Sequence, residues 1–281
     1  MKNFFKHVSF LLLLVLTALI FISCASQKPQ EDQPAIADTD TTEFDTNAID
    51  TDTADTEPQE TEPQVPKKRI ALTFDDGPAF DNDNFQRLTY KLVDKLAEYD
   101  GAATFFLVGN RINKITGEAI KYASDNGSEI GIHAYTHDYN FSSCDYSVFI
   151  DELEQTKAQI EKYSGKEVTL FRPPYGSLTT SRAIDSGYPI INWSVDSEDW
   201  RYKSRADDET AKNNINTIVE NILSQVEDGD IVLMHEIYQN SYEAACIVID
   251  RLSAEGYEFV TVSELIGEEN LEIGKIYYNA P

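Results

Sequence analysis

The chain has 281 residues and carries 23 Lys and Arg against 49 Asp and Glu, a formal net charge of −26. A charge of this sign argues against nucleic acid and anionic membrane surfaces as electrostatic partners, because both attract basic surfaces. With 41% hydrophobic residues the chain is too apolar to be disordered throughout, and it is long enough for one domain with a substantial core.

The first 24 residues are predicted to be an export signal. Lys2 and Lys6 precede an apolar run over residues 8–22, which is too short for a membrane-spanning helix. The run ends at Ser23-Cys24, which resembles the bacterial lipobox, in which the cysteine is lipidated and becomes the new N-terminus. The alternative is an ordinary cleaved signal peptide that contains a cysteine. We expect an exported protein, held on the outer face of the cell membrane only by a lipid on Cys24, or a secreted one.

Residues 25–66 are predicted to be a disordered acidic linker. They contain twelve acidic residues and one basic residue, with many Thr, Pro and Gln and almost nothing that packs. Such a segment cannot bury enough apolar surface to offset the conformational entropy that ordering removes. We expect it to hold a folded domain away from the membrane.

Residues 67–281 are predicted to form a single α/β domain. Short β-branched and aromatic runs alternate with longer runs that have apolar residues at three- and four-residue spacing, as in βα units around a parallel sheet. The predicted strands are 69–74, 103–108, 129–132, 168–171, 190–195, 231–234 and 258–261. The predicted helices are 84–99, 116–126, 146–163, 207–226 and 242–255. Seven strands favour a distorted (β/α)7-type barrel, closed or nearly closed, with functional groups at the C-terminal strand ends.

Two cysteines remain if Cys24 is lipidated, and in an exported protein Cys144 and Cys246 can pair. The alternative, which we favour, is that Cys246 lies in the apolar run 244–248 and serves as a small core residue.

Three of the four histidines, His133, His137 and His235, come directly after predicted strands or within one turn of them. His133 and His137 are four residues apart, a spacing that places two imidazoles on one side of a helical turn and suits a metal ion. Chance placement on a solvated turn is the alternative. Residue 134 is Ala, which excludes the peptidase motif His-Glu-x-x-His. A third ligand is still needed, and a carboxylate suits a zinc that keeps one position open for water.

Candidates for that carboxylate are Asp75 and Asp76, which follow the first predicted strand and precede Gly77-Pro78. They can be a plain turn, because Asp, Gly and Pro are good turn formers. Neighbouring side chains on an extended segment point in different directions, so one carboxylate can also bind metal while the other faces a water. That division suits metal-assisted hydrolysis.

Five motifs occur in one order along the domain. They are Thr-Phe-Asp-Asp-Gly-Pro at 73–78, His-Ala-Tyr-Thr-His at 133–137, Arg-Pro-Pro-Tyr at 172–175, Asp-Ser-Glu-Asp-Trp at 196–200 and Leu-Met-His at 233–235. In these motifs the chain resembles the polysaccharide deacetylases of carbohydrate esterase family 4, which share the NodB homology domain. The resemblance covers roughly residues 69–266.

The resemblance implies a role for each motif. Asp76, His133 and His137 would bind a divalent metal, with zinc expected. Asp75 would be the general base, and Arg172 would orient it and keep it ionised. His235 would be the general acid that protonates the leaving amine, with Asp199 as its charged partner. The substrate would be bound by the backbone N–H of Tyr175, which would hold the oxyanion, and by the walls of the acetyl pocket, Trp200 and Leu233.

Each of these residues also has a plain structural interpretation. Arg172 can be a surface residue at a strand exit, Asp199 an exposed acid beside a core indole, and His235 a strand-end histidine. Two positions depart from the family pattern, because Ala134 stands where relatives commonly have Ser or Thr, and Tyr238 stands where many have a further His after the acid Glu236. Neither departure changes a ligand or a proton-transfer group.

The sequence therefore predicts a metal-dependent hydrolase that removes N-acetyl groups from N-acetylglucosamine in a polysaccharide, with peptidoglycan as the expected substrate and a monomer as the expected state. One alternative within the fold is a chitooligosaccharide deacetylase or an esterase that removes O-acetyl groups from xylan. An alternative of another class is a non-catalytic glycan-binding surface lipoprotein. Such a binder needs neither Asp75 nor His235, so the presence of both residues argues against it.

Overall fold

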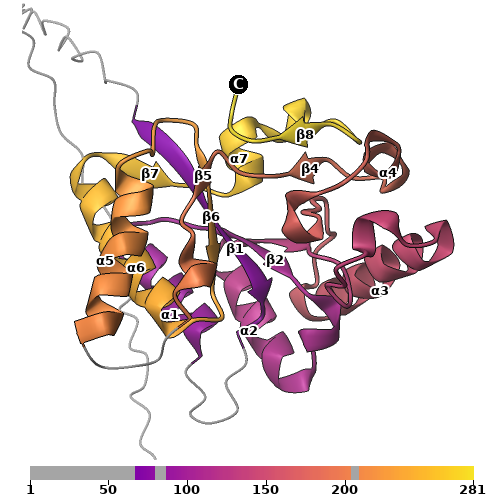
Figure 1. Cartoon of the computed structure of the whole chain (residues 1–281), viewed down its shortest axis with the longest axis horizontal. Helices are drawn as coiled ribbons and strands as arrows, with labels where there is room; N and C mark the ends of the chain where they lie inside the picture. The colour runs from indigo at the N-terminus through magenta and orange to yellow at the C-terminus, as the bar shows by residue number, and fades with distance from the viewer. Residues whose placement is uncertain (1–66, 80–86, 204–208) are drawn as a thin grey trace, which may run out of the picture. The chain divides into compact units, whose positions relative to one another are not determined.

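The computed structural model describes residues 67–79, 87–203 and 209–281 (Figure 1). These residues belong to one compact unit, Thr61–Pro281. The predicted export signal with Cys24 and the predicted acidic linker lie outside the described residues. Within the described ranges, no helix is both long enough and apolar enough to cross a membrane.

A parallel sheet forms the centre of the unit. Its strands are ordered β3 (Glu129–Ile132), β2 (Thr104–Leu107), β1 (Lys68–Gly77), β6 (Ile231–His235) and β5 (Val195–Asp196), and β7 (Tyr257–Phe259) pairs with the first residues of β1. The apolar residues of β1 are fully buried, as expected for a central parallel strand. Asp75 of β1 is the register partner of His235 of β6, so two predicted site residues end adjacent strands.

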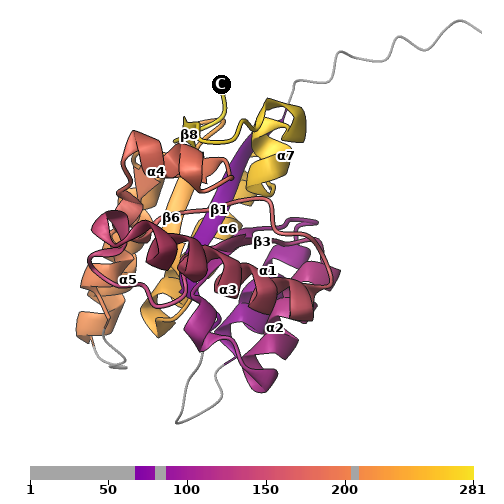
Figure 2. The same ribbon diagram turned by 90° about the vertical axis from the view of Figure 1, so that its right-hand side faces the viewer.

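Helices pack in a row around this sheet (Figures 1 and 2). Contacts run from α5 (Glu209–Leu223) to α6 (Gln239–Ala254), then to α1 (Leu88–Ala97), α2 (Lys114–Asp125) and α3 (Tyr146–Ser164). Each helix turns an apolar stripe inward, because its buried residues recur at three- and four-residue spacing. The remaining short elements are α4 (Thr180–Asp185), α7 (Val262–Ile266) and the 3₁₀ turns η1 (Gly109–Arg111), η2 (Phe141–Ser143), η3 (Pro174–Gly176), η4 (Asp199–Arg201) and η5 (Glu268–Asn270).

Local sequence explains where α2 and α3 begin or end. The Asn113 side chain accepts hydrogen bonds from the first backbone N–H groups of α2, and Thr116 completes a capping box by bonding back to Asn113. Helix α3 ends at Gly165, whose φ of 68° lies in the left-handed region that favours glycine.

The prediction of an α/β domain with a parallel sheet is confirmed, and the barrel is nearly closed rather than closed. Beyond β3, pairing is reduced to isolated bridges of Phe171 with Ile132 and with Ile190. Ile190 belongs to β4 (Ile190–Ile191), which pairs with β8 (Ile276–Tyr277) in a separate two-stranded sheet. Val195, five residues after Ile190, begins β5, which pairs with β6. Residues 190–196 therefore connect the β3 edge of the sheet, through the Phe171 bridges, with its β5 edge.

Two predicted strands differ from the structure. The predicted strand 168–171 is a bridge at Phe171 only, because Pro173 and Pro174 follow it and have no N–H to extend a ladder. The predicted strand 190–195 is divided, because Asn192 N–H donates to Tyr277 in the two-stranded sheet whereas Ser194 N–H donates to β6. The elements α4, α7 and β8 were not predicted. Cys144 and Cys246 are both free, so they form no disulfide. The prediction that Cys246 is a core residue is wrong, because its side chain is only half-buried on α6.

Candidate active site and metal centre

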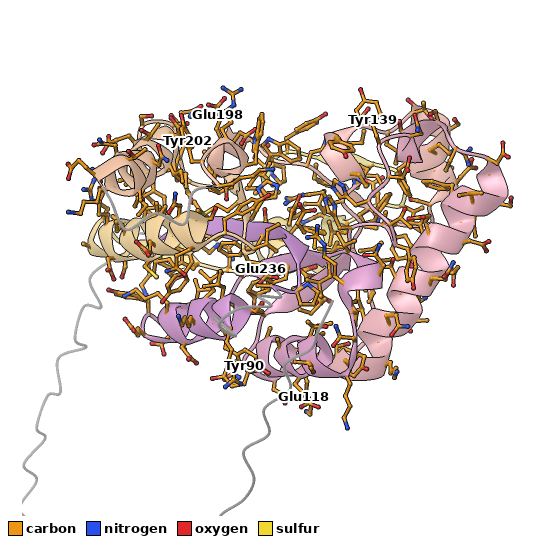
Figure 3. All side chains as sticks on the ribbon, turned by 60° about the horizontal axis from the view of Figure 1, so that its bottom comes forward. Tyr90, Glu118, Tyr139, Glu198, Tyr202 and Glu236 are labelled. Carbon is orange, nitrogen blue, oxygen red and sulfur yellow. The ribbon has the colours of Figure 1, made fainter. Side chains whose placement is uncertain are left out.

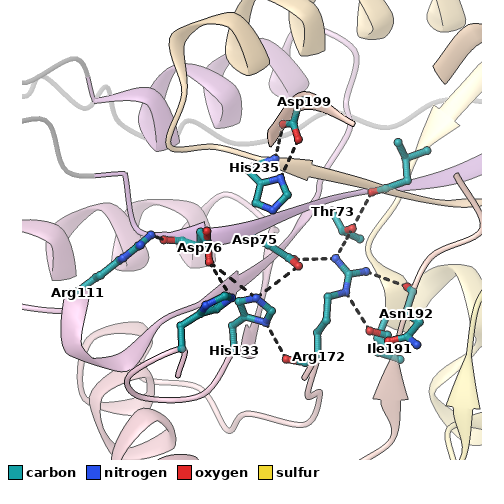
Figure 4. Close-up of polar contacts among 12 residues, drawn as sticks. Thr73, Asp75, Asp76, Arg111, His133, Arg172, Ile191, Asn192, Asp199 and His235 are labelled. Atoms are coloured by element: carbon teal, nitrogen blue, oxygen red, sulfur yellow. Dashed lines mark hydrogen bonds and ion pairs between the residues drawn. The ribbon is translucent and has the colours of Figure 1, made fainter. Parts of the chain in front are cut away.

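The strand ends bring the predicted polar residues together (Figure 4). Asp75 and Asp76 lie at the end of β1, His133 directly follows β3, and His235 ends β6. Arg172 follows the bridging residue Phe171. This is the C-terminal edge of a parallel sheet, where α/β domains commonly place their sites.

Asp76, His133 and His137 form the one group among the described residues that is suited to hold a metal ion. One ligand atom from each residue lies within 4.8 Å of the other two. The distance from Asp76 Oδ1 is 3.8 Å to His133 Nε2 and 3.4 Å to His137 Nε2. Two imidazoles and one carboxylate are a donor set that zinc accepts.

The condition of Asp76 supports a cation at this position. Its Oδ1 is buried and has no hydrogen-bond partner among the described residues, which is costly for a carboxylate oxygen unless something else neutralises it. Burial alone would raise the pKa of Asp76, but the neighbouring histidines and Arg111 lower it below its usual value. The residues present therefore fit a divalent metal.

His133 is oriented as a metal-binding histidine. Its Nδ1 lies 2.7 Å from the Arg172 carbonyl oxygen, and a carbonyl only accepts, so Nδ1 carries the proton and Nε2 is free to ligate. Burial lowers the pKa of His133, despite the nearby carboxylates, and so favours the neutral ring that a metal requires.

Arg172 lies at the centre of a buried network and is fully inaccessible to solvent. Its Nη1 donates to Asp75 Oδ1 and to Thr73 Oγ1, both at 2.7 Å. Its other nitrogens donate to the backbone carbonyls of Ile191 and Asn192 at 2.9 Å, so all three nitrogens of the guanidinium are engaged. The surface interpretation of Arg172 is wrong, and the side chain holds Asp75 in one orientation. The second oxygen of Asp75 lies 3.6 Å from His133 Nε2.

Asp199 holds His235 from two directions. Its Oδ1 is 2.7 Å from His235 Nδ1, and its Oδ2 accepts a hydrogen bond from the His235 backbone N–H at 2.7 Å. Asp199 is fully buried, so its exposed interpretation is wrong as well. Burial opposes the charged ring, but the ion pair and hydrogen bond with Asp199 prevail and raise the pKa of His235 to about 9. His235 is therefore protonated at neutral pH and can donate a proton from Nε2.

A cavity of about 460 Å³ opens above these groups. Its lining contains Asp75, Asp76, His133, His137 and His235 together with the predicted substrate residues Tyr175, Trp200 and Leu233. Figure 3 shows the side chains of the described residues, with the labelled Glu198 and Tyr202 close together and Tyr139 apart from them. Leu233 is buried at the floor, whereas Tyr175 and Trp200 are exposed at the rim.

Five residues of the site were not predicted. Thr73 has a signal in the sequence, because it lies two residues before Asp75 on the same face of a strand. Trp193 and Asp196 lie before and within the motif at 196–200, but their spacing does not predict that their side chains line the cavity. Tyr238 has a signal in the sequence, because it stands where many relatives have a further His, whereas Lys203 lines the cavity with no such signal.

Backbone strain is concentrated around the cavity. Ala134, His137, Tyr175 and Glu198 all have φ between 54° and 63°, in the left-handed region, and Asp76 has a φ of 70°. Non-glycine residues pay of order 1 kcal/mol or more for this conformation, so such residues persist only where the surrounding structure fixes them. At Tyr175 the strained turn presents the ring edge-on to His137, with centroids 4.8 Å apart.

The structure accounts for Ala134, the first departure from the family pattern. Ala134 is fully buried, and Glu152 of α3 supports the loop in place of a hydroxyl at that position. The Glu152 carboxylate accepts hydrogen bonds from the backbone N–H groups of Tyr135 and Thr136 at 2.8 and 2.7 Å, and from the Thr136 hydroxyl at 2.7 Å.

Glu236, the acid of the second departure, is fully buried and accepts a hydrogen bond from the Thr89 hydroxyl. Burial raises the pKa of Glu236 to about 8, although the Thr89 hydrogen bond and Arg111 oppose the shift. Its Oε1 occupies the space that a Cβ at Gly77 would need, so any other residue there would displace the buried Glu236 carboxylate.

Comparisons with known proteins agree with this geometry. The family described as Polysaccharide deacetylase matches residues 62–190. The chain is 36% identical to the peptidoglycan-N-acetylglucosamine deacetylase PgdA of Listeria monocytogenes, over 76% of this chain and 43% of PgdA. It is 34% identical to the peptidoglycan-N-acetylmuramic acid deacetylase PdaC of Bacillus subtilis, over 71% of this chain and 39% of PdaC. The chain thus spans about two-fifths of the length of these two relatives.

Solved structures extend the likeness to three dimensions. The structure of Bacillus subtilis PdaC has a TM-score of 0.63 at 35% identity, over 73% of this chain and 91% of that one. A family 4 acetyl xylan esterase from Clostridium thermocellum in complex with a cobalt ion has a TM-score of 0.65 at 30% identity, over 76% of this chain and 100% of that one. The chain belongs to the polysaccharide deacetylase family, carbohydrate esterase family 4, whose members are metal-dependent.

Proposed function

We propose that this protein removes N-acetyl groups from N-acetylglucosamine residues of peptidoglycan, with a zinc ion held by Asp76, His133 and His137. The observation that carries the proposal is the placement of a carboxylate, Asp75, and a protonated imidazole, His235, at register-paired strand ends beside the metal triad. The likeness to PgdA and to other peptidoglycan deacetylases supports the choice of glycan.

The reaction requires two proton transfers, and the site has one group for each. When bound, the metal supplies Lewis acidity that polarises the acetamide carbonyl. Asp75 takes a proton from the attacking water, and the hydrogen bond from Arg172 Nη1 fixes the orientation of that carboxylate. His235 gives its Nε2 proton to the departing nitrogen when the C–N bond breaks. The products are acetate and a free glucosamine amine.

The cavity walls fit an acetyl group. Leu233 and Trp193 offer apolar surface beside the reacting atoms, and Trp200 covers one side at the rim. Tyr175 lies against the metal ligand His137, where its backbone N–H is our candidate for binding the oxyanion. An apolar, partly enclosed wall strengthens the electrostatic interactions that the charged groups make with the reacting amide.

Acetate release decides between the candidate substrates. The zinc-loaded protein is incubated with purified peptidoglycan, chitooligosaccharide and acetylated xylan, and acetate and free amine are measured. We expect release from peptidoglycan, a loss of about 10²–10⁴-fold in the Asp75→Asn and His235→Ala variants, and zinc still bound in both. Full activity in either variant would contradict the proposed mechanism. Activity that a chelator does not reduce would contradict the proposed role of the metal.

A second candidate is removal of O-acetyl groups from xylan, which the similarity to the family 4 acetyl xylan esterase favours. An ester leaving group needs less help from an acid than an amine does, so His235→Ala would then lower activity far less than Asp75→Asn. The ratio of the two losses separates the candidates.

Export and anchoring are part of the proposal. We propose that the mature protein is a lipoprotein on the outer face of the cell membrane, attached through Cys24, because the ending Ser23-Cys24 resembles a lipobox. Metabolic labelling with a fatty acid tests this, and label that persists in the Cys24→Ser variant would contradict it.

A further inference from the structure

The cavity has one basic side chain that no step of the proposed reaction uses. Among the described residues that line it, Lys203 is the single Lys or Arg. Arg172 lies buried beneath, committed to Asp75. Arg201 pairs with Glu198 at 3.1 Å and lies against the Trp200 ring, and it does not line the cavity.

Among the described residues, an aromatic ring and not a carboxylate positions Lys203. Its Nζ lies 5.4 Å from the centroid of the Tyr238 ring, and that ring lies 6.3 Å from the ring of His235. Within residues 67–79, 87–203 and 209–281, no Asp or Glu forms an ion pair with Lys203. A cation–π contact orients the ammonium and leaves its N–H donors available to a ligand.

The carboxylates of the cavity are engaged elsewhere. Asp75 pairs with Arg172, and Asp76 faces His133 and His137. Asp196 accepts a hydrogen bond from the Glu198 backbone N–H at 2.8 Å. With respect to the described residues, the ammonium of Lys203 is therefore available to a bound molecule.

The charge of the whole chain gives this lysine its significance. At a net −26, the protein repels anionic polymers over most of its surface. A neutral glycan needs no cation at the rim of the cavity, whereas a glycan that carries carboxylates needs one close to the reacting sugar. At short range the attraction between one cation and a substrate carboxylate can exceed the repulsion from acidic residues that are more distant and screened by salt.

We propose that Lys203, oriented by Tyr238, binds a carboxylate on the sugar next to the one that loses its acetyl group. The class of substrate is a β-linked glycan in which acetylated sugars have neighbours bearing a carboxylate, either on a lactyl ether or on a uronic acid. This inference rests on the proposed function of the same site and adds a reason for choosing among glycans.

The test compares anionic and neutral substrates. Peptide-free peptidoglycan strands, which carry free lactyl carboxylates, are compared with chitotetraose. Acetylated xylan bearing glucuronic acid forms a third arm. We expect Lys203→Gln to raise KM for the peptide-free strands about five-fold more than for chitotetraose, with kcat little changed. Lys203→Arg should restore binding, and Tyr238→Ala should reproduce part of the loss while Tyr238→Phe does not.

Controls separate this effect from a general one. Lys212→Gln removes the same charge from an exposed position on α5 and should change neither KM. Raising the salt concentration should weaken the wild type on the anionic strands and have little effect on the Lys203→Gln variant. A larger effect on the xylan arm than on the peptide-free strands would assign the carboxylate to a uronic acid.

Two outcomes would overturn the inference: equal changes in KM on anionic and neutral glycans, or no change on either. If the wild type releases acetate from no glycan, the proposed function fails separately. Binding of the peptide-free strands and chitotetraose to the metal-free protein, measured by calorimetry with and without Lys203→Gln, then decides the role of Lys203.

Discussion

At the scale of single residues, His235 shows how burial and a charged partner together set a protonation state. Burial favours the neutral ring, yet the pKa of His235 rises to about 9 because Asp199 is fully buried and bonds to both its ring and its backbone. A folded pKa above the unfolded value of about 6.5 stabilises the fold below that value. This contribution is lost as the pH rises through about 9.

The titration of His235 is directly measurable. In the metal-free protein, NMR of the ring protons should report a pKa near 9 for this residue. In the Asp199→Asn variant this charge is gone but the burial and the more distant Asp75 and Asp76 remain, so the pKa should fall well below 9. An unchanged pKa in that variant would show that Asp199 does not set the charge of His235.

Arg172 should be essential for stability as well as for activity. Arg172→Met leaves the Asp75 carboxylate buried beside a neutral side chain, which costs about 3–5 kcal/mol in the free energy of unfolding. Urea denaturation measures this loss. Arg251→Met is the matched control, because Arg251 is exposed and its ion pair with Glu220 is 3.5 Å long, so its loss should stay within about 1 kcal/mol. Equal losses in both variants would contradict the role of the buried network.

At the scale of elements, the sequence was most informative about β1 and β6. Their apolar runs end in Asp75 and His235, and parallel pairing brings both ends to one edge. The strained turns at Ala134 and Tyr175 could not be predicted, because left-handed backbone at these residues depends on support from distant segments. The switch of residues 190–196 from pairing with β8 to pairing with β6 could not be predicted either, because it depends on where β8 lies in the folded chain. Local patterns indicate which elements form, and tertiary hydrogen bonds decide how they are divided.

Helix α3 supplies such distant support through Glu152. Its carboxylate holds the backbone N–H groups of Tyr135 and Thr136, midway between the two metal-binding histidines. We expect Glu152→Ala to weaken zinc affinity by about 10–100-fold, as loss of groups behind metal ligands commonly does. Calorimetric titration of the metal-free protein with zinc measures this.

Two variants sharpen that measurement. Glu152→Gln retains an acceptor oxygen and should lose less affinity than Glu152→Ala. Glu154→Ala changes an exposed acid on the same helix and should leave the zinc affinity unchanged. Similar affinities in all four proteins would show that the loop holds its histidines without help from α3.

At the scale of the whole molecule, the metal site joins distant parts of the chain. Asp76 ends the first strand, whereas His133 and His137 follow the third, so a bound ion links segments almost 60 residues apart. Zinc that binds only the folded state, present at 100 times its dissociation constant, stabilises it by about 2.7 kcal/mol. For a domain of this size that shift corresponds to roughly 5–10 °C in Tm.

We therefore expect the Tm of the chelated protein to rise by several degrees when zinc is restored. His137→Ala is the informative variant, because His137 is partly exposed and its loss removes one ligand with little damage to the core. In that variant the rise should largely disappear, while the chelated Tm stays close to that of the chelated wild type. Differential scanning calorimetry with a chelator and with excess zinc distinguishes the cases. A zinc-dependent rise that is the same in both proteins would place the stabilising ion elsewhere, since the triad without His137 keeps only two of its three ligands.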